Sequence, residues 1–280
     1  MTAKRLAFLG PPGTFSEEAA LKYDSSAECL PMATITAVAA AVDAGMADQA
    51  IVPIENSLEG SVTETLDLLV HNAHPLSMYS ELTLPIEHYL LAKPGTKADQ
   101  VRLIFAHPQA LGQCRGFIER CFPKAAIEAA LSNSAAVEEM MGHDNAAAVG
   151  TRRAAEIYSA QVLAKGIQDR SPNITRFVVL AGSDHPPTGR DKTSLACGFA
   201  VEDRPGLLVG ALEEFSRRAI NLSKIESRPS KEKLGTYIFL MDVDGHRTDE
   251  PLAEALRAVE AKCSFFRILG SYPRYREQPA

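Results

Sequence analysis

The stretch FLGPPGTFSEEAA, residues 8–20, decides the fold of the N-terminal part of the chain. It completes the apolar run Leu6–Leu9, which has the length and composition of a buried strand. Pro11 and Pro12 cannot donate to a sheet ladder, so the strand must end there. Thr14 and the glutamate three residues later have the spacing of a capping box, which predicts the start of a helix. The stretch therefore indicates a strand, a sharp turn and a helix in direct succession.

The same alternation of apolar runs and alanine-rich helical segments continues to Leu180. Further strands are predicted at Ala50–Ile54, Leu103–Phe105, Ile127–Leu131 and Ala146–Val149. Helices are predicted to end near Tyr23, Val70, Phe122, Met141 and Ala160. The segment Leu82–Ala92 has the pattern of a strand with no helix after it, which suggests a crossover between two lobes. Such alternation is typical of the α/β class, with mainly parallel sheets covered by helices.

The polar stretch AGSDHPPTGRDK, residues 181–192, contains glycines and paired prolines that indicate a linker. After it the order of the predicted strands and helices changes. Strands are then predicted at Thr193–Val201, Asn221–Arg228, Leu234–Val243 and Phe265–Tyr272, and helices at Gly206–Ala219 and Glu250–Cys263. This βαββαβ order is the α+β ferredoxin-like arrangement. We therefore expect one domain at residues 1–182, a linker at 183–192 and a second domain at 193–280.

Composition excludes several classes of function. The 280 residues carry a formal net charge of -6 with scattered Lys and Arg, so we expect no nucleic-acid partner. The N-terminal apolar run is too short for a signal peptide and no stretch is long enough to span a membrane, so we expect a cytoplasmic protein. The five cysteines form no CxxC pair or Cys/His cluster, which argues against a metal site. Nucleotide-binding and common hydrolase motifs are missing as well, and we expect no cofactor.

Hydrogen-bonding side chains, all uncharged except that of Glu55, follow the carboxyl ends of the predicted strands. They are Thr14 and Ser16; Glu55, Asn56 and Ser57; Gln109 and Gln113; Ser132, Asn133 and Ser134; and Thr151. Ligands of open α/β sheets bind in the crevice outside these strand ends. Helix N-termini there favour anions, so a substrate carrying carboxylates is the natural expectation.

Thr175 and Arg176 stand just ahead of the last strand, Phe177–Leu180. Arg176 could clamp a carboxylate and Thr175 could donate to a leaving oxygen. A solvated arginine, a threonine that satisfies backbone groups and simple helix capping are the ordinary alternatives for these motifs. His107, before a proline at a helix start, receives no role.

Taken together, six motifs in this order resemble monofunctional prephenate dehydratase from about Lys4 to Tyr272: GPPGTFSEEAA, PIENSLEGSV, HPQALGQC, NSAA, NITRF and NLSKIESRP. The resemblance implies a two-lobed, periplasmic-binding-protein-like dehydratase domain and a C-terminal ACT domain of ferredoxin-like fold. It implies conversion of prephenate to phenylpyruvate in phenylalanine biosynthesis, with L-phenylalanine as feedback effector. It also implies a homodimer or homotetramer, and we expect no fused mutase ahead of Lys4.

The resemblance also assigns residues to roles. The implied catalytic set is Thr175, Arg176, Glu55, Asn56, Ser57, Gln109 and Gln113. The substrate-binding set is Thr14, Ser16, Ser132, Asn133, Ser134, Thr151 and Phe177. The effector set is Gly206, Leu207, Leu208, Asn221, Glu226, Ser227, Arg228 and Pro229. Two alternatives stay open: arogenate dehydratase, which runs the same elimination on the transaminated substrate, and a sensor that binds a carboxylate ligand without reacting it.

Overall fold

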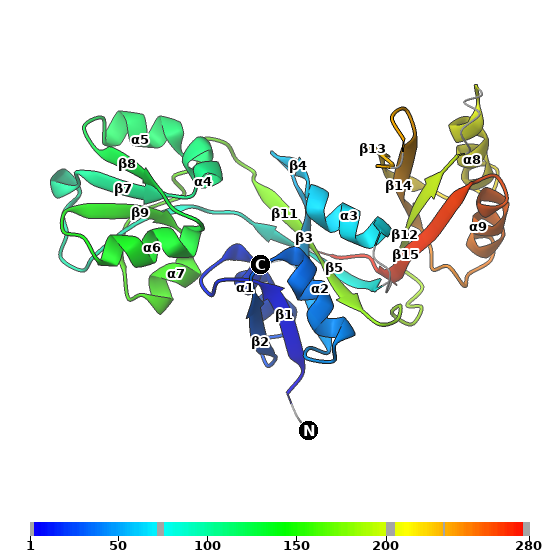
Figure 1. Cartoon of the computed structure of the whole chain (residues 1–280), viewed down its shortest axis with the longest axis horizontal. Coiled ribbons are helices and arrows are strands. Elements are labelled where there is room, and N and C mark those ends of the chain that lie inside the picture. Colours follow the sequence, from blue (N-terminus) through cyan, green and yellow to red (C-terminus); the bar gives the residue numbers. More distant parts are fainter. Residues whose placement is uncertain (1–2, 72–75, 200–204, 232, 277–280) are drawn as a thin grey trace. The chain divides into compact units, whose positions relative to one another are not determined.

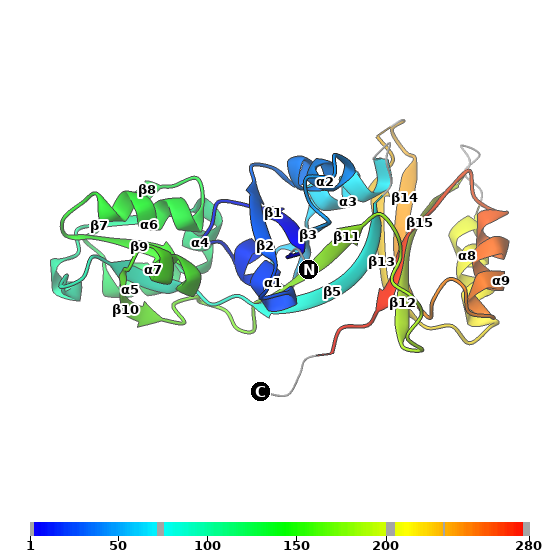
Figure 2. The same cartoon turned by 90° about the horizontal axis from the view of Figure 1, so that it is seen from below.

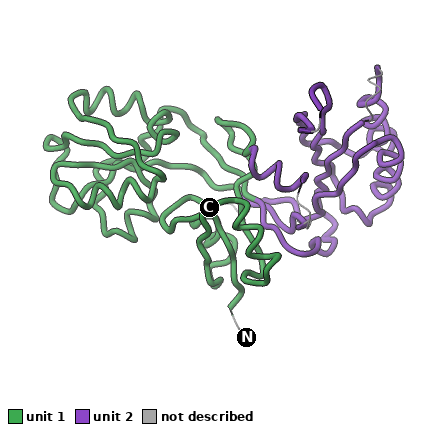
Figure 3. Tube along the Cα trace, viewed as in Figure 1, with its two compact units in different colours: residues 1–62, 83–177 green, residues 63–82, 178–280 purple. Residues whose placement is uncertain are grey.

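The computed structural model describes residues 3–71, 76–199, 205–231 and 233–276 (Figure 1). By their internal packing the residues divide into two compact units, coloured separately in Figure 3. The first unit comprises Met1–Val62 and Thr83–Phe177, and the second comprises Thr63–Leu82 and Val178–Ala280. The domain boundaries expected from the sequence, at residues 182 and 193, stay a prediction.

The N-terminal sheet has the strand order β2-β1-β3-β11-β5, with β4 paired to β3. Its strands are β1 (Arg5–Leu9), β2 (Glu28–Met32), β3 (Gln49–Asn56), β4 (Gly60–Ser61), β5 (Ser77–Pro85) and β11 (Ile174–Ala181). β1 runs parallel to β2 and β3, and β4 runs antiparallel to β3. Two helices, α1 (Phe15–Tyr23) and α2 (Ile35–Asp43), contact β1 and β3. The strand, turn and helix predicted at the N-terminus are confirmed.

The sequence pattern does not predict two elements of this layer, β2 and α2. β2 lies at the edge of the sheet, contains Pro31 and has no buried residue, so it lacks the apolar run that marks a strand. α2 is rich in alanine, which places small apolar side chains on every face and blurs the helical period. Packing on the sheet, rather than local pattern, defines both elements.

The other sheet of the first unit has the order β10-β6-β9-β7-β8. Its strands are β6 (Tyr89–Ala92), β7 (Leu103–Ala106), β8 (Ala126–Ala129), β9 (Ala146–Gly150) and β10 (Gln161–Lys165). The accompanying helices are α4 (Pro108–Gln113), α5 (Arg115–Cys121), α6 (Asn133–Met141), α7 (Arg152–Ile157) and the 3₁₀ turn η1 (Ala98–Gln100). β7 is parallel to β8 and β9, whereas β6 is antiparallel to β9 and β10. The α/β class is confirmed, with sheets that mix parallel and antiparallel pairs.

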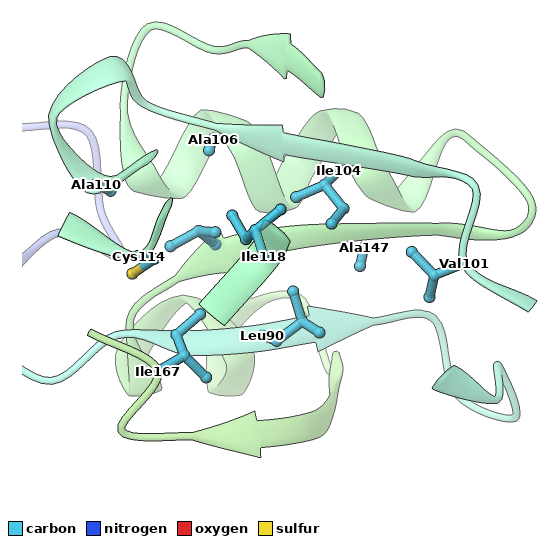
Figure 4. Packing of buried hydrophobic residues seen from close by; sticks show 10 residues of the cluster. Leu90, Val101, Ile104, Ala106, Ala110, Cys114, Ile118, Ala147 and Ile167 are labelled. Atoms are coloured by element: carbon cyan, nitrogen blue, oxygen red, sulfur yellow. The ribbon is translucent and has the colours of Figure 1, made fainter. Parts of the chain in front are cut away.

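Alternate side chains of these strands pack into two cores on opposite faces, as the pleat of a strand requires. Leu90 and Ile104 point into a cluster with Cys114, which lies between α4 and α5, and with Ile118 of α5 (Figure 4). Their neighbours in the chain, Leu91 and Phe105, belong to a second cluster that is covered by α6 and α7. Because both faces are apolar, these strands appear in the sequence as continuous apolar runs.

Two predicted elements differ in the structure, and one strand of this sheet is not predicted from the sequence. The single strand predicted at Leu82–Ala92 is two strands, because β5 ends at Pro85 and β6 begins at Tyr89 in the other sheet. The single helix predicted to reach Phe122 is divided at Cys114 into α4 and α5. β10 is not predicted, since it is a five-residue edge strand with no buried residue and only a short apolar run.

The second unit contains the predicted βαββαβ element order. Its strands are β12 (Asp191–Gly198), β13 (Leu222–Pro229), β14 (Tyr237–Asp244) and β15 (Phe265–Pro273), and its helices are α8 (Leu207–Ser216) and α9 (Leu252–Glu260). The sheet order is β13-β14-β12-β15, with every neighbouring pair antiparallel. Figure 2 shows α8 and α9 side by side on one face, where they cover a core that includes Leu195 and Phe215. The ferredoxin-like arrangement is confirmed; the predicted end of its first strand, Val201, lies outside the described residues.

The second unit also holds α3 (Thr63–His71), which follows β4 in the chain and contacts β15. The Arg267 guanidinium on β15 donates to the carbonyl oxygens of Leu69 and Val70, at 3.2 and 2.8 Å, and so satisfies the end of α3. No helix among the described residues combines the length and apolar character needed to cross a bilayer.

Candidate functional site

A cavity of about 460 Å³ in the first unit collects residues from both of its sheets. The predicted site residues that line it are Thr14, Ser16, Asn56, Gln109, Gln113, Ser132, Asn133, Thr175 and Phe177. Asn56 ends β3, Thr175 and Phe177 lie in the first half of β11, and the others lie at the starts of α1 and α6 or in α4. These three helices follow the carboxyl ends of β1, β8 and β7, as the crevice argument expects. Five predicted site residues lie outside the lining: Glu55, Ser57, Ser134, Thr151 and Arg176.

The turn before α1 is built so that Thr14 reaches the cavity. Thr14 caps the helix by accepting a hydrogen bond from the Glu17 amide, and the Glu17 carboxylate accepts from the Gly13 amide at 2.6 Å. Gly13 has φ +88°, and a Cβ there would lie 2.6 Å from the Ser134 side-chain oxygen. The position therefore requires glycine on grounds of both backbone conformation and space.

Two of the residues outside the lining hold this turn in place. The Thr151 hydroxyl donates to the Gly13 carbonyl oxygen at 2.7 Å and also accepts from the Ala154 amide, capping α7. The Ser134 hydroxyl donates to the carbonyl oxygen of Pro12. Their contacts attach helices α6 and α7 to the turn between β1 and α1. Both side chains are buried.

Asn56, at the end of β3, fixes the hydrogen-bonding direction of Thr175. Its Oδ1 accepts from the backbone amides of Leu58 and Glu59, at 2.9 and 3.0 Å. Its Nδ2 must therefore face the other way, where it donates to Asn173 Oδ1 at 2.8 Å and Thr175 Oγ1 at 2.9 Å. Because the Thr175 oxygen accepts this bond, its own proton is available for donation at the cavity wall.

Gln113 continues the series of hydrogen-bonded side-chain amides that begins with Asn56 and Asn173. Its Nε2 donates to Glu59 Oε1 at 3.0 Å, and its Oε1 accepts from Asn173 Nδ2 at 2.9 Å. The same oxygen lies 2.9 Å from His88 Nε2. Three residues of this hydrogen-bonded series, Glu59, Asn173 and His88, are not predicted from the sequence. Only their polar character beside or within apolar segments could have drawn attention to them.

His88 is 2% exposed, and its ring lies edge-on to Phe15 at a centroid distance of 5.5 Å. Burial lowers its pKa, against a raising effect from the bond with Gln113, so the ring is neutral at physiological pH. Burial also lowers the pKa of His107, which precedes Pro108 at the start of α4 and lines the cavity. Neither histidine is placed to carry a charge for an anionic ligand.

The remaining residues of the catalytic prediction lie beside the cavity. Ser57 accepts from the Ile174 amide through its hydroxyl and donates its own amide to the Ile174 carbonyl, each at 2.9 Å. These two bonds hold the turn after β3 against the start of β11. The guanidinium of Arg176 lies 3.7 Å from the Glu55 carboxylate, and Arg176 is the more enclosed of the two.

The predicted effector residues all lie in the second unit. Gly206, Leu207 and Leu208 are at the start of α8, where Gly206 has φ +93°. Glu226, Ser227, Arg228 and Pro229 lie on the edge strand β13, and Asn221 immediately precedes that strand. Arg228 pairs with Asp67 of α3 at 3.3 Å.

The fold and the cavity define a two-lobed α/β ligand-binding unit in a chain that also carries a ferredoxin-like module. Residues 6–185 match the family described as prephenate dehydratase, and residues 197–261 match the ACT domain. The chain belongs to the prephenate dehydratase family.

Three relatives illustrate the similarity. The prephenate dehydratase of Mycobacterium sp. (strain JLS) is 40% identical over an alignment 283 positions long, gaps included. The alignment covers 96% of this chain and 89% of the relative. The crystal structure of prephenate dehydratase from Arthrobacter aurescens in complex with L-Phe is 37% identical with a TM-score of 0.87, covering 99% of this chain and 92% of that one. A solved structure described as GqqA, a novel type of quorum quenching acylase, is 30% identical with a TM-score of 0.87, covering 97% and 98%. Since fold alone does not fix chemistry, the site residues must carry the functional argument.

Proposed function

We propose that the cavity binds prephenate and that the protein catalyses its decarboxylating dehydration to phenylpyruvate. The observation that carries this proposal is the hydrogen bond from Asn56 to Thr175, which leaves the Thr175 proton free to be donated. In the reaction the bond between the ring and its carboxylate breaks and carbon dioxide leaves. The released electron pair makes the ring aromatic as the C–O bond breaks and hydroxide departs. A donated hydrogen bond from Thr175 stabilises the charge that develops on the leaving oxygen.

Prephenate carries two carboxylates, and the cavity offers groups that suit them. Helices α1 and α6 begin at its wall with the capping residues Thr14 and Ser132. Their first turns present backbone N–H groups and the positive end of the helix dipole. The neutral amides of Gln109 and Asn133 add uncharged donors beside them. Such a lining binds an anion without neutralising it fully, which keeps the ring carboxylate ready to leave.

Glu55, Ser57 and Arg176 belong to the proposed catalytic set as residues beside the cavity. Ser57 fixes the turn that carries Asn56, through its two bonds with Ile174. The Arg176 guanidinium lies 3.7 Å from the Glu55 carboxylate, and we propose that this pair supports the strand segments that carry Thr175 and Asn56. No step of this mechanism is assigned to a metal ion or an organic cofactor.

Turnover of prephenate is the direct test. The purified protein is incubated with prephenate at mildly alkaline pH, where spontaneous aromatisation is slow, and phenylpyruvate is followed against an enzyme-free control. We expect rapid formation. Conversion of arogenate to phenylalanine, with no turnover of prephenate, would make the chain an arogenate dehydratase. Saturable binding of prephenate without turnover would support the sensor alternative and remove the catalytic proposal.

We further propose that L-phenylalanine regulates the enzyme through the ACT domain, in a cytoplasmic homodimer or homotetramer. The L-Phe complex of the Arthrobacter relative supports the choice of ligand. The proposed contacts are the Gly206–Leu208 helix start and the Glu226–Pro229 segment of β13. Linkage requires that if L-phenylalanine weakens prephenate binding, prephenate weakens L-phenylalanine binding by the same factor. Calorimetric titration of the slowly reacting Thr175→Val variant with L-phenylalanine, with and without prephenate, measures this factor; an L-phenylalanine affinity that prephenate leaves unchanged would contradict the regulatory proposal.

A further inference from the structure

His88 lies in the wall of the cavity and has no role in the proposed reaction. Its backbone is held on both sides, since its amide donates to Gln168 Oε1 at 3.1 Å and its carbonyl accepts from the Ile167 amide at 3.1 Å. The preceding Ile86 amide donates to the Asn173 carbonyl oxygen at 2.8 Å. The ring is therefore fixed in position by the backbone of two segments that run beside the cavity.

The hydrogen-bond direction at His88 follows from its neighbours. A carboxylate only accepts, so Glu59 requires the Nε2 group of Gln113 to face it. Gln113 Oε1 must then face both Asn173 Nδ2 and His88 Nε2, at 2.9 Å each. Since Gln113 Oε1 only accepts, His88 Nε2 carries the proton and donates it.

The other ring nitrogen confirms the neutral form. His88 Nδ1 is buried and has no hydrogen-bond partner among the residues that the structure describes. Protonation would bury an unpaired N–H together with a positive charge, which is costly in an enclosed site. His88 is thus a neutral donor at Nε2, held against one side of the Gln113 amide while Glu59 holds the other side.

We propose that His88 is a positioning residue that, together with Glu59, locks the orientation of the Gln113 amide and, through it, of the Asn173 amide that accepts from Asn56 beside Thr175. The inference rests on the proposed function, because it assigns His88 a part in the same reaction. The path runs from His88 Nε2 to Gln113 Oε1, then through Asn173 to Asn56 Nδ2, every step being 2.8–2.9 Å. Without the histidine, Gln113 Oε1 loses one of two donors and the amide can rotate away from Asn173.

Two substitutions separate positioning from bulk packing. His88→Leu fills similar space without a donor and should lower kcat by about tenfold to a hundredfold, with a smaller change in KM, since misplaced catalytic groups have effects of this order. His88→Gln offers an amide N–H at the place of Nε2 and should recover most of the lost kcat. Leu91→Ala, which opens a cavity in the neighbouring core, is the control for reduced stability and should leave kcat near the wild-type value.

A double-mutant cycle with Gln113→Ala tests the path itself. If His88 acts through Gln113, His88→Leu should change kcat by less than twofold in the Gln113→Ala background. Equal fold losses in both backgrounds would overturn the proposal, as would equal losses in His88→Leu and His88→Gln.

The tautomer of His88, measured by NMR without substrate, tests the hydrogen-bond direction independently of which substrate the protein converts. In ¹⁵N-labelled protein the His88 signal is identified by its loss in His88→Gln. At pH 7.5 it should report the neutral tautomer protonated at Nε2, and a tautomer protonated at Nδ1 would refute the hydrogen-bond direction. If wild-type protein fails to convert prephenate while this tautomer is found, the proposed function fails and the orientation of Gln113 by His88 stands as a feature of the binding site.

Discussion

Asn56→Asp reverses the direction of the hydrogen bond on which the mechanism depends. The two residues have the same shape, so the bonds from the Leu58 and Glu59 amides to Oδ1 can persist. The other oxygen of the new carboxylate replaces Nδ2 and can only accept. It would face the acceptor Asn173 Oδ1 at 2.8 Å and the Thr175 oxygen at 2.9 Å. Thr175 is then expected to donate its proton to residue 56 rather than to the leaving group.

The size of the effect follows from the strength of that new bond. A hydrogen bond from a hydroxyl to a charged acceptor contributes about 1.5–3 kcal/mol. It must be broken before Thr175 can serve the leaving oxygen, so kcat should fall about 10- to 150-fold. Circular dichroism and the midpoint of urea unfolding should show that the variant remains folded.

Added negative charge needs its own control, since the substrate is an anion. Asn133→Asp places a carboxylate in the same cavity, at the first residue of α6, away from the hydrogen bond between Asn56 and Thr175. It should raise KM through repulsion and change kcat less than Asn56→Asp does. If Asn56→Asp keeps kcat within threefold of the wild type, the proposed direction of the Thr175 hydroxyl is wrong.

Two further predictions concern stability. Gly13→Ala should lower the free energy of unfolding by about 2–4 kcal/mol, because an alanine there is strained at φ +88° and its Cβ would lie 2.6 Å from Ser134 Oγ; urea denaturation measures this, and an unchanged midpoint would contradict it. For Glu214, hydrogen bonds from Lys262 and then Arg218 lower the pKa to about 2, from 4.5 in an unfolded chain. A depressed carboxyl pKa stabilises the fold above pH 4.5, and this stabilisation is lost as the pH falls toward about 2. Glu214→Gln should therefore be less stable than the wild type at pH 6, with the difference shrinking below pH 4.5; a constant difference would refute the assignment.

The sequence predicts the parts of the site that depend on local chemistry. Thr14 caps α1 because a threonine with glutamate three residues later satisfies free amides at a helix start. Asn56 ends β3 and Gln113 belongs to the helix that follows β7, and the carboxyl ends of strands are where open α/β sheets bind ligands, so both are expected in one cavity. Both predictions need only the order of strands and helices.

The residues that the sequence misses depend on contacts between distant segments. His88 stands inside an apolar stretch, and its partner Gln113 belongs to a different element. Asn173 becomes recognisable only when the start of β11 lies beside Asn56 and Gln113. Periodicity and capping rules carry no information on such pairs, so the direction of the hydrogen-bond chain could not be read from the sequence.

Steady-state turnover of prephenate by Thr175→Val, compared with Thr175→Ser, tests the central claim most directly. Valine keeps the shape of threonine but removes the hydroxyl, whereas serine keeps the donor. Loss of one donor to developing charge predicts a fall in kcat of about 10²- to 10³-fold for valine, with an unchanged unfolding midpoint. Serine should retain most of the activity. A Thr175→Val enzyme that turns over prephenate at a near wild-type rate would contradict the account.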